Sequence, residues 1–210
     1  RNNDFVKLIK IVANKFARFY IFVIRGTPMM VQSLIFYYAI FNLFKRTGMS
    51  VTEINRVWSL FISGLVTVSL NSTAYLAEVL RGGILAVDAG QMEAARSLGM
   101  THWQAMRRVV FPQAIKNSLP AIGNEFIINI KDSSVLCVLG VSDLMFMTRS
   151  VAGIYYKGTE CYLIAATVYL FLTYLSSLLL KAITGRMTAP DNTKRRQGNQ
   201  TVDLGLPSSN

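Results

Sequence analysis

The sequence predicts an all-α membrane protein with four spanning helices and a pair of short polar helices between the second and third spans. Three long runs contain no charged residue: residues 26–44, 57–77 and 161–180, which are 19, 21 and 20 residues long. Each run can cross about 30 Å of hydrocarbon as a helix that rises about 1.5 Å per residue. A charged, polar segment at residues 88–112 interrupts this apolar sequence.

The fourth predicted span, residues 118–148, is apolar but irregular. Charged residues interrupt it at Glu125, Lys131, Asp132 and Asp143. Charges inside a membrane segment are costly and by default mark a functional site or an internal pair. We therefore expect this span to face the interior of the helix bundle.

The two ends of the chain differ from its middle. Residues 1–20 are amphipathic and basic rather than uniformly apolar. Residues 191–210 are polar and lack apolar periodicity, which predicts a disordered tail. Residues 1–190 are predicted to form a single membrane domain.

The net charge of +11 could suit a nucleic-acid-binding protein, but the distribution of the charge favours a membrane protein. Residues 1–18, 81–116 and 181–210 hold five Lys or Arg residues each, whereas 45–56 hold three and 149–157 hold two. The positive-inside rule therefore places the N-terminal segment, the polar helix pair and the C-terminal tail in the cytoplasm. Four apolar spans argue against a soluble nucleic-acid binder.

The first helix of the polar pair is predicted to begin near Ala89. Asp88 can accept hydrogen bonds from free amide groups, and Gln91 can reach back to the start of the helix. Gly99 can take the left-handed conformation that closes a helix.

The second helix is predicted to open with a capping box formed by Thr101 and Gln104. Pro112 lacks a backbone donor, so it should bend or end this helix. The prediction is two short helices that meet at a corner, a charged element for which docking of a soluble partner is the natural explanation.

The same segment resembles the cytoplasmic EAA loop of bacterial ABC importer permeases. The match begins with Glu93-Ala94-Ala95 and continues with Gly99 and Pro112, which follow at the distances along the chain that the family shows. Phe111-Pro112 stands where the family usually has Leu-Pro. The resemblance implies that Glu93, Ala94, Ala95, Gly99 and Pro112 couple the chain to an ATPase.

A second motif lies at the start of the first span. Arg25-Gly-Thr-Pro28, followed by Gln32, resembles the Arg-Gly-Thr-Pro signature of polar amino-acid permeases. Pro28 should kink the helix and free carbonyl groups that neighbouring side chains must satisfy. Gln32 is a candidate for the solute path. Arg25 could equally extend towards the lipid headgroups.

Polar residues recur on one face of the second span. Asn71, Tyr75 and Glu78 are spaced by four and three residues, so they share a helix face. Asn71 and Tyr75 are candidates for the solute path, although polar side chains in membrane helices often serve packing alone. Glu78 and Arg81, three residues apart, are predicted to form a structural ion pair at the cytoplasmic boundary.

The fourth span carries the richest polar pattern. Glu125, Asn129 and Asp132 recur at spacings of four and three, so one helix face holds two carboxylates and an amide. The stretch from Leu119-Pro120 to Ser134 resembles the Leu-Pro, Asn-Glu and Lys-Asp-Thr-Ser pattern of polar amino-acid permeases, with Ser133 in place of the usual Thr. Solute-path candidates here are Glu125, Asn129, Asp132, Ser133 and Ser134. The alternative is that Lys131 neutralises a carboxylate and that the face binds only neighbouring helices.

The sequence offers no catalytic or metal chemistry. It has no Gly-x-x-x-x-Gly-Lys-Ser/Thr loop for nucleotide phosphates and no convincing pair of nucleophile and base. The two cysteines, Cys137 and Cys161, have no metal-ligand neighbours and are interpreted as packing residues. The chain is therefore predicted not to be an enzyme and to need no cofactor of its own.

The resemblance covers residues 25–182 and implies a polar amino-acid ABC importer permease with the type I importer transmembrane fold. The family's first spanning helix is missing from this sequence, for which truncation is the simplest explanation. The implied partners are a dimer of ATPase subunits that bind ATP and Mg²⁺, a second permease subunit, an extracytoplasmic solute-binding protein and membrane lipid. The second permease could be a copy of this chain or a sister chain. The implied location is the bacterial inner membrane.

An ATP-independent channel or secondary carrier is the alternative function. Co-purification of a separate ATPase would decide against it. Which amino acid is carried, and whether the solute binds within this chain, stays open at this point.

Overall fold

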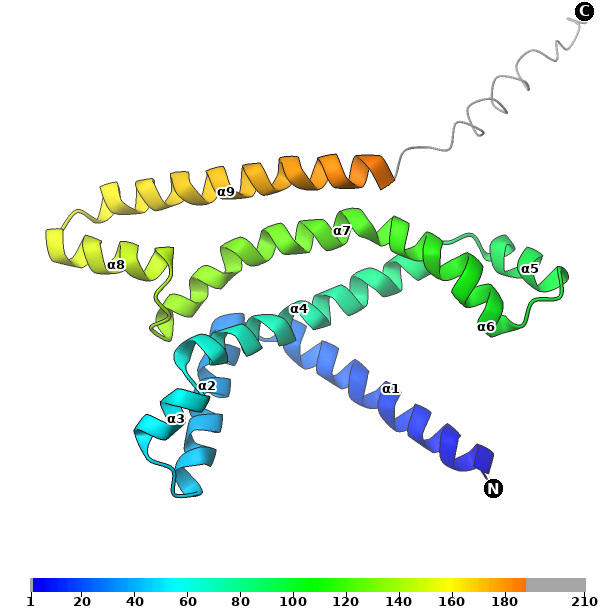
Figure 1. The fold of residues 1–210 in the computed structure, drawn as a ribbon, viewed down its shortest axis with the longest axis horizontal. Helices are drawn as coiled ribbons and strands as arrows, with labels where there is room; N and C mark the ends of the chain where they lie inside the picture. Colours follow the sequence, from blue (N-terminus) through cyan, green and yellow to red (C-terminus); the bar gives the residue numbers. More distant parts are fainter. Residues whose placement is uncertain (1, 188–210) are drawn as a thin grey trace, which may run out of the picture.

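The computed structural model describes residues 2–187, and within this range the ordered elements are helices (Figure 1). The predicted tail at 191–210 lies outside the described residues. In chain order the elements are α1 (Asn2–Gly26), α2 (Met29–Arg46), α3 (Val51–Val57), α4 (Leu60–Leu85), α5 (Ala89–Ser97), α6 (His102–Ala105), the π-helical turn η1 (Met106–Val110), α7 (Phe111–Asp132), the 3₁₀ segment η2 (Ser133–Val138), α8 (Leu144–Tyr155) and α9 (Gly158–Met187).

Two helices are long and apolar enough to cross a membrane as single spans. They are α4 and the first 28 residues of α9, which correspond to the predicted spans at 57–77 and 161–180. α1 and α2 together pass the same criterion as one bent pair, which gives up to three spans among the described residues. The all-α membrane fold is confirmed, although length and composition support fewer uninterrupted spans than the four predicted.

The predicted span at 26–44 begins at a break between two helices. α1 ends at Gly26, α2 begins at Met29, and the helix direction bends by 113° between them. Pro28 precedes α2 in an extended conformation, with φ −63° and ψ 136°. Because proline cannot donate within a helix and restricts the residue before it, the kink expected at this position becomes a full break.

The predicted irregular span at 118–148 is divided among three elements. α7 ends at Asp132, η2 follows, and Gly140 has a φ of +93° before α8 begins at Leu144. A glycine accepts this left-handed backbone without the steric cost of a Cβ atom. The irregularity is confirmed, and the segment is not one continuous helix.

Small residues allow α4 and α7 to pack closely. A Cβ atom on Gly83 would lie 1.8 Å from Ser118 Oγ and 2.7 Å from the Ala114 carbonyl oxygen, so these backbones are nearly in contact. Ser118 also donates a 3.3 Å hydrogen bond to the Val79 carbonyl. Close approach over small residues is how membrane helices gain packing energy, since lipid supplies no hydrophobic driving force between them. The α4–α7 crossing is therefore the centre of the fold.

The arrangement separates two ends of the molecule. α4, α7 and α9 lie side by side, with α7 in the middle (Figure 1). The start of α1, the α5–α6 pair and the C-terminal part of α9 lie towards one end, on the right of the view, whereas α3 and α8 lie towards the other. The described parts of the three basic segments, residues 2–18, 81–116 and 181–187, thus lie towards the same end, as expected of segments on one side of a membrane.

Candidate functional site

The polar helix pair begins and turns as its sequence predicts. Asp88 Oδ1 accepts a 2.7 Å hydrogen bond from the Gly90 amide, and α5 begins at Ala89. Gly99 has a φ of +84°. The Thr101 hydroxyl accepts from the Gln104 amide at 3.3 Å, and Gln104 Oε1 accepts from the Thr101 amide at 2.9 Å. The predicted helix start, left-handed glycine and capping box are all present.

One contact at the start of α5 differs from the prediction. Gln91 was expected to reach back to its own helix, but its Oε1 atom accepts a 3.2 Å hydrogen bond from Gln113 Nε2. Gln113 lies on α7 and also donates to the Val109 carbonyl at 2.9 Å. The start of α5 is thereby linked to the start of α7.

The second helix of the pair is neither short nor ended by Pro112. α6 continues through the π-helical turn η1 into α7, which runs to Asp132. Pro112 removes one donor and its ring would clash with the carbonyl four residues earlier in a regular helix. A π-helical turn places one extra residue in the helix and so accommodates the proline without ending it. The exposed helix pair is thus continuous with a helix that crosses the core.

The surface of the pair carries large apolar side chains that have no cover within the described chain. Leu98 is 81% exposed and Trp103 is 70% exposed. Glu93, Ala94, Gly99 and Pro112 are exposed as well, whereas Ala95 is buried. Exposed apolar groups framed by polar residues are typical of a surface that binds another protein. Ala95 instead belongs to the interior of the pair.

The helix break at Pro28 is satisfied by Gln32. Its Nε2 atom shares its two hydrogens among three acceptors: the Ile24 carbonyl at 2.7 Å, the Thr27 carbonyl at 2.9 Å and the Thr27 hydroxyl at 2.7 Å. These are carbonyl groups that the broken helix leaves without backbone partners. Gln32 Oε1 in turn accepts a 3.2 Å hydrogen bond from Asn71 Nδ2 of α4. Both side chains are buried, and this geometry gives them a structural role at the break.

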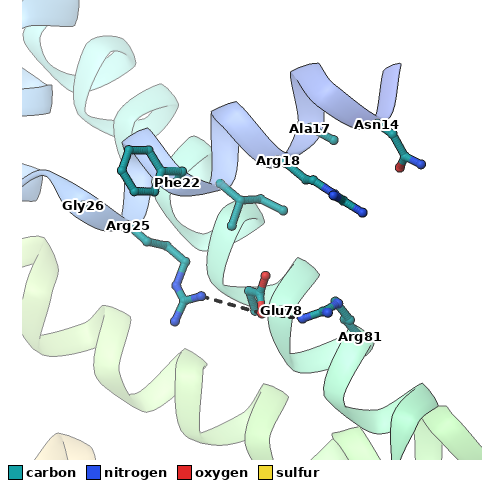
Figure 2. A pocket seen from close by; sticks show the side chains of 9 residues that line it. Asn14, Ala17, Arg18, Phe22, Arg25, Gly26, Glu78 and Arg81 are labelled. Carbon is teal, nitrogen blue, oxygen red and sulfur yellow. Dashed lines mark ion pairs between the residues drawn. The ribbon is translucent and has the colours of Figure 1, made fainter. Parts of the chain in front are cut away.

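Arg25 and Glu78 form a small charged cluster with two neighbours on α4. Glu78 Oε2 lies 3.8 Å from Arg25 Nη1 and 3.7 Å from Arg81 Nη1 (Figure 2). The Arg25 guanidinium carbon lies 5.3 Å from the centre of the Tyr75 ring, within the range of a cation–π contact. The predicted Glu78–Arg81 pair is present. The contribution of Arg25 was not foreseen, because 53 residues separate it from Glu78.

The predicted polar face of α7 is only partly gathered in one place. Glu125 is half-buried and lies within electrostatic range of Asp132 on its own helix and of Arg25 on α1. Asn129 is half-buried and Asp132 is exposed. Ser133 donates to the Ile130 carbonyl at 3.0 Å, and Ser134 hydrogen-bonds to Tyr169 of α9. Glu125, Asn129 and Asp132 therefore remain available to a solute, while the two serines have partners within the chain.

Lys131 is not paired with a carboxylate among residues 2–187, although it lies beside Asp132 in the sequence. Successive residues of a helix point in directions about 100° apart, so adjacent charges do not face one another. Among residues 2–187, neither Glu125 nor Asp132 therefore has an ion-pair partner on α7.

Comparison with known proteins identifies relatives over most of the chain. Residues 8–189 match the family model described as "Binding-protein-dependent transport system inner membrane component". The chain is 34% identical over 176 residues to the glutamine transport system permease protein GlnP of Escherichia coli (strain K12), covering 84% of this chain and 76% of that protein. It is 37% identical over 182 residues to the probable amino-acid permease protein YxeN of Bacillus subtilis (strain 168), covering 87% and 78%.

A relative with a different named solute and a solved structure extend this similarity. The nopaline transport system permease protein NocM of Agrobacterium fabrum (strain C58) is 34% identical over 173 residues, covering 80% of this chain and 70% of that protein. The solved structure is described as an amino acid ABC transporter with histidines. It has 45% sequence identity and a TM-score of 0.71, and the match covers 86% of this chain and 78% of that one.

Proposed function

Since this chain belongs to the family of binding-protein-dependent transport system inner membrane components and, within it, to the amino-acid ABC permeases, we propose that it imports a polar amino acid by using energy from a separate ATPase. Its place in this family and its apolar helices make it a multi-pass protein of the bacterial inner membrane. Beyond its family and location, we propose how the chain is coupled to the ATPase, which partners it has and which residues line the solute path.

We base the coupling proposal on the fact that α6, η1 and α7 form one uninterrupted helical segment. The exposed helix pair contains Leu98 and Trp103, which suit a protein partner, and it is hydrogen-bonded to α7 through Gln91 and Gln113. A helix transmits a displacement along its axis because its hydrogen-bonded backbone is stiff. We infer that movement of an ATPase bound to the pair shifts α7, and with it Glu125 and Asp132, between two arrangements of the bundle.

The proposed partners follow from this mechanism and from the family. Two ATPase subunits would hold ATP and Mg²⁺ and grip the helix pair from the cytoplasm, through Glu93, Ala94 and Gly99. A second permease subunit, either a copy of this chain or a sister, would complete the path. A solute-binding protein would deliver the amino acid from outside. The charge distribution supports this orientation, because the described parts of the basic segments lie towards the end that carries the helix pair.

For the solute path we propose the face of α7 that carries Glu125, Asn129 and Asp132. Two carboxylates suit the ammonium group that every amino acid carries, and the amide can hydrogen-bond a polar side chain. Tyr75 and Glu78 contact Arg25 through a cation–π contact and an ion pair. Gln32 and Asn71 stabilise the helix break through their hydrogen bond. We therefore propose that these four residues support the path rather than line it. Similar proteins are named for glutamine, nopaline and histidine. Each of these compounds carries an α-ammonium group or a derivative of it, as other amino acids do.

The proposal is tested with the permease complex, its ATPase and its binding protein in liposomes. Each of a panel of amino acids is added on the side of the binding protein, and ATP hydrolysis is measured. We expect one chemical group of polar amino acids to stimulate hydrolysis, and Asp132→Asn to weaken that stimulation more than Asn42→Asp, a change of charge on α2. Uptake that proceeds without ATP would contradict the proposal and favour a channel or secondary carrier.

A further inference from the structure

A pocket of about 780 Å³ lies between α1 and α4, and no residue of the proposed solute face of α7 lines it. Its polar lining consists mainly of Arg18 and Arg25 from α1 and of Glu78 and Arg81 from α4. In Figure 2 the two α1 arginines extend from one helix and Arg81 from the other, with Glu78 between Arg25 and Arg81. Ile21 and Phe22 supply an apolar part of the same wall.

The charges in this pocket do not balance. Three guanidinium groups meet one carboxylate, which leaves a net charge of +2. A single oxygen of Glu78 serves both Arg25 and Arg81, at the long distances of 3.8 and 3.7 Å. Arg18 has no ion-pair partner among the described residues, and the side chain of Arg81 is 70% exposed. The pocket therefore has donors to spare for an anion.

The pocket lies where charged and apolar sequence meet. Arg18 is the last cation of the basic segment 1–18, and Arg81 is the first of the basic segment 81–116. Phe22, one turn further along α1 than Arg18, is 76% exposed. Guanidinium groups prefer the level of the lipid headgroups, and aromatic rings prefer the adjoining edge of the acyl-chain region. The neighbouring Arg18 and Phe22 therefore suit a position at that boundary.

We propose that this pocket binds the headgroup of an anionic phospholipid from the cytoplasmic leaflet. Arg18 and Arg81 would hold the phosphate diester with charge-assisted hydrogen bonds, because the planar guanidinium group matches the geometry of phosphate oxygens. The acyl chains would lie along Ile21 and Phe22. Basic pockets between membrane helices on the cytoplasmic side are suited to anionic headgroups.

This inference rests on the cytoplasmic orientation proposed above and is independent of the transported solute. A bound lipid would fill the open angle between α1 and α4 and neutralise the excess charge around Glu78. Free phosphate offers the same anion without acyl chains, so the test includes both sources.

The test is native mass spectrometry of the detergent-purified permease complex, titrated with phosphatidylglycerol, with phosphatidylcholine of the same acyl chains and with inorganic phosphate. We expect phosphatidylglycerol to bind at a discrete site and more tightly than phosphatidylcholine, and inorganic phosphate not to displace it. Arg18→Gln should weaken phosphatidylglycerol binding about fivefold, the effect of one cation near an anionic lipid surface. Arg18 is exposed and makes no ion pair in the described chain, so this variant should keep the fold.

Two charge-removing controls sharpen the test. Lys15→Gln removes a charge from the same helix outside the pocket, and Arg56→Gln removes one from α3 at the other end of the molecule. Both should bind phosphatidylglycerol as the unaltered protein does. Equal affinity for the two lipids, equal losses in Arg18→Gln and Lys15→Gln, or displacement by inorganic phosphate would each overturn the inference. Amino-acid-stimulated ATP hydrolysis that persists alongside such a result would leave the proposed function intact.

Discussion

Gln32 Oε1 accepts a hydrogen bond of 3.2 Å from Asn71 Nδ2, and this contact joins the break at Pro28 to the middle of α4. The same amide of Gln32, on α2, donates back to carbonyl groups of Ile24 and Thr27, which precede Pro28. One buried side chain thus stabilises the bend within its own segment and fixes that bend against a neighbouring helix.

Replacing Gln32 by leucine should destabilise the protein because the new side chain fills the space and makes none of these hydrogen bonds. The Ile24 and Thr27 carbonyls and the Asn71 amide would lose their partner. An unsatisfied buried polar group costs about 1–3 kcal/mol, so the midpoint of thermal unfolding in detergent should fall. Asn42→Leu, at an exposed position of α2, is the control and should leave the midpoint close to that of the parent protein.

The two adjacent glycines of α4 should respond differently to alanine. A Cβ atom on Gly83 would overlap Ser118 Oγ and the Ala114 carbonyl, whereas one on Gly82 would meet nothing within 4 Å. We expect Gly83→Ala to cost about 1–3 kcal/mol through overpacking at the α4–α7 crossing. Gly82→Ala should be neutral or slightly stabilising, because alanine favours the helix. Unfolding midpoints of the two variants compare them directly; equal midpoints would contradict this description of the crossing.

Gly99 should be needed for its backbone conformation rather than for its small size. Its φ is +84°, and a Cβ atom there would meet nothing within 4 Å. A left-handed backbone costs an L-residue about 1–2 kcal/mol, and a β-branched side chain finds it the most unfavourable. Gly99→Val should therefore distort the corner between α5 and α6 and lower transport per ATP hydrolysed.

Asparagine tolerates the left-handed region better than valine does, so Gly99→Asn is the matched variant. It should retain more transport per ATP than Gly99→Val in the same liposomes. If the valine variant transports at an unchanged rate, Gly99 does not take part in coupling.

Local patterns were sufficient to predict much of the exposed helix pair. The contacts of Asp88, the capping box of Thr101 and Gln104, and the ion pair of Glu78 and Arg81 join residues at most three positions apart. Such contacts depend on the geometry of one helical turn, which the spacing of the residues determines. The left-handed backbone at Gly99 belongs to the same class.

Contacts between distant segments could not be predicted in this way. Asn71 meets Gln32 across 39 residues, and Glu78 meets Arg25 only because α1 turns back on α4. The continuation of the helix through Pro112 was missed because a proline predicts a bend or an end, while the π-helical turn that accommodates it leaves no local signal. The resemblance of residues 131–134 to a family string placed Ser134 among the solute-path candidates, although its hydrogen-bond partner is Tyr169 on another helix.

The proposed function requires that this chain move a polar amino acid inward when an ATPase acts on its α5–α6 helix pair. The most direct measurement is uptake of the stimulating amino acid into liposomes that hold the complete complex, with ATP supplied to the face that carries the helix pair. We expect uptake with ATP, none with a non-hydrolysable analogue, and reduced uptake in Leu98→Asp but not in Val51→Asp, which adds the same charge at an exposed apolar position of α3. Uptake that is the same with ATP and with the analogue would contradict ATP-driven import by this chain.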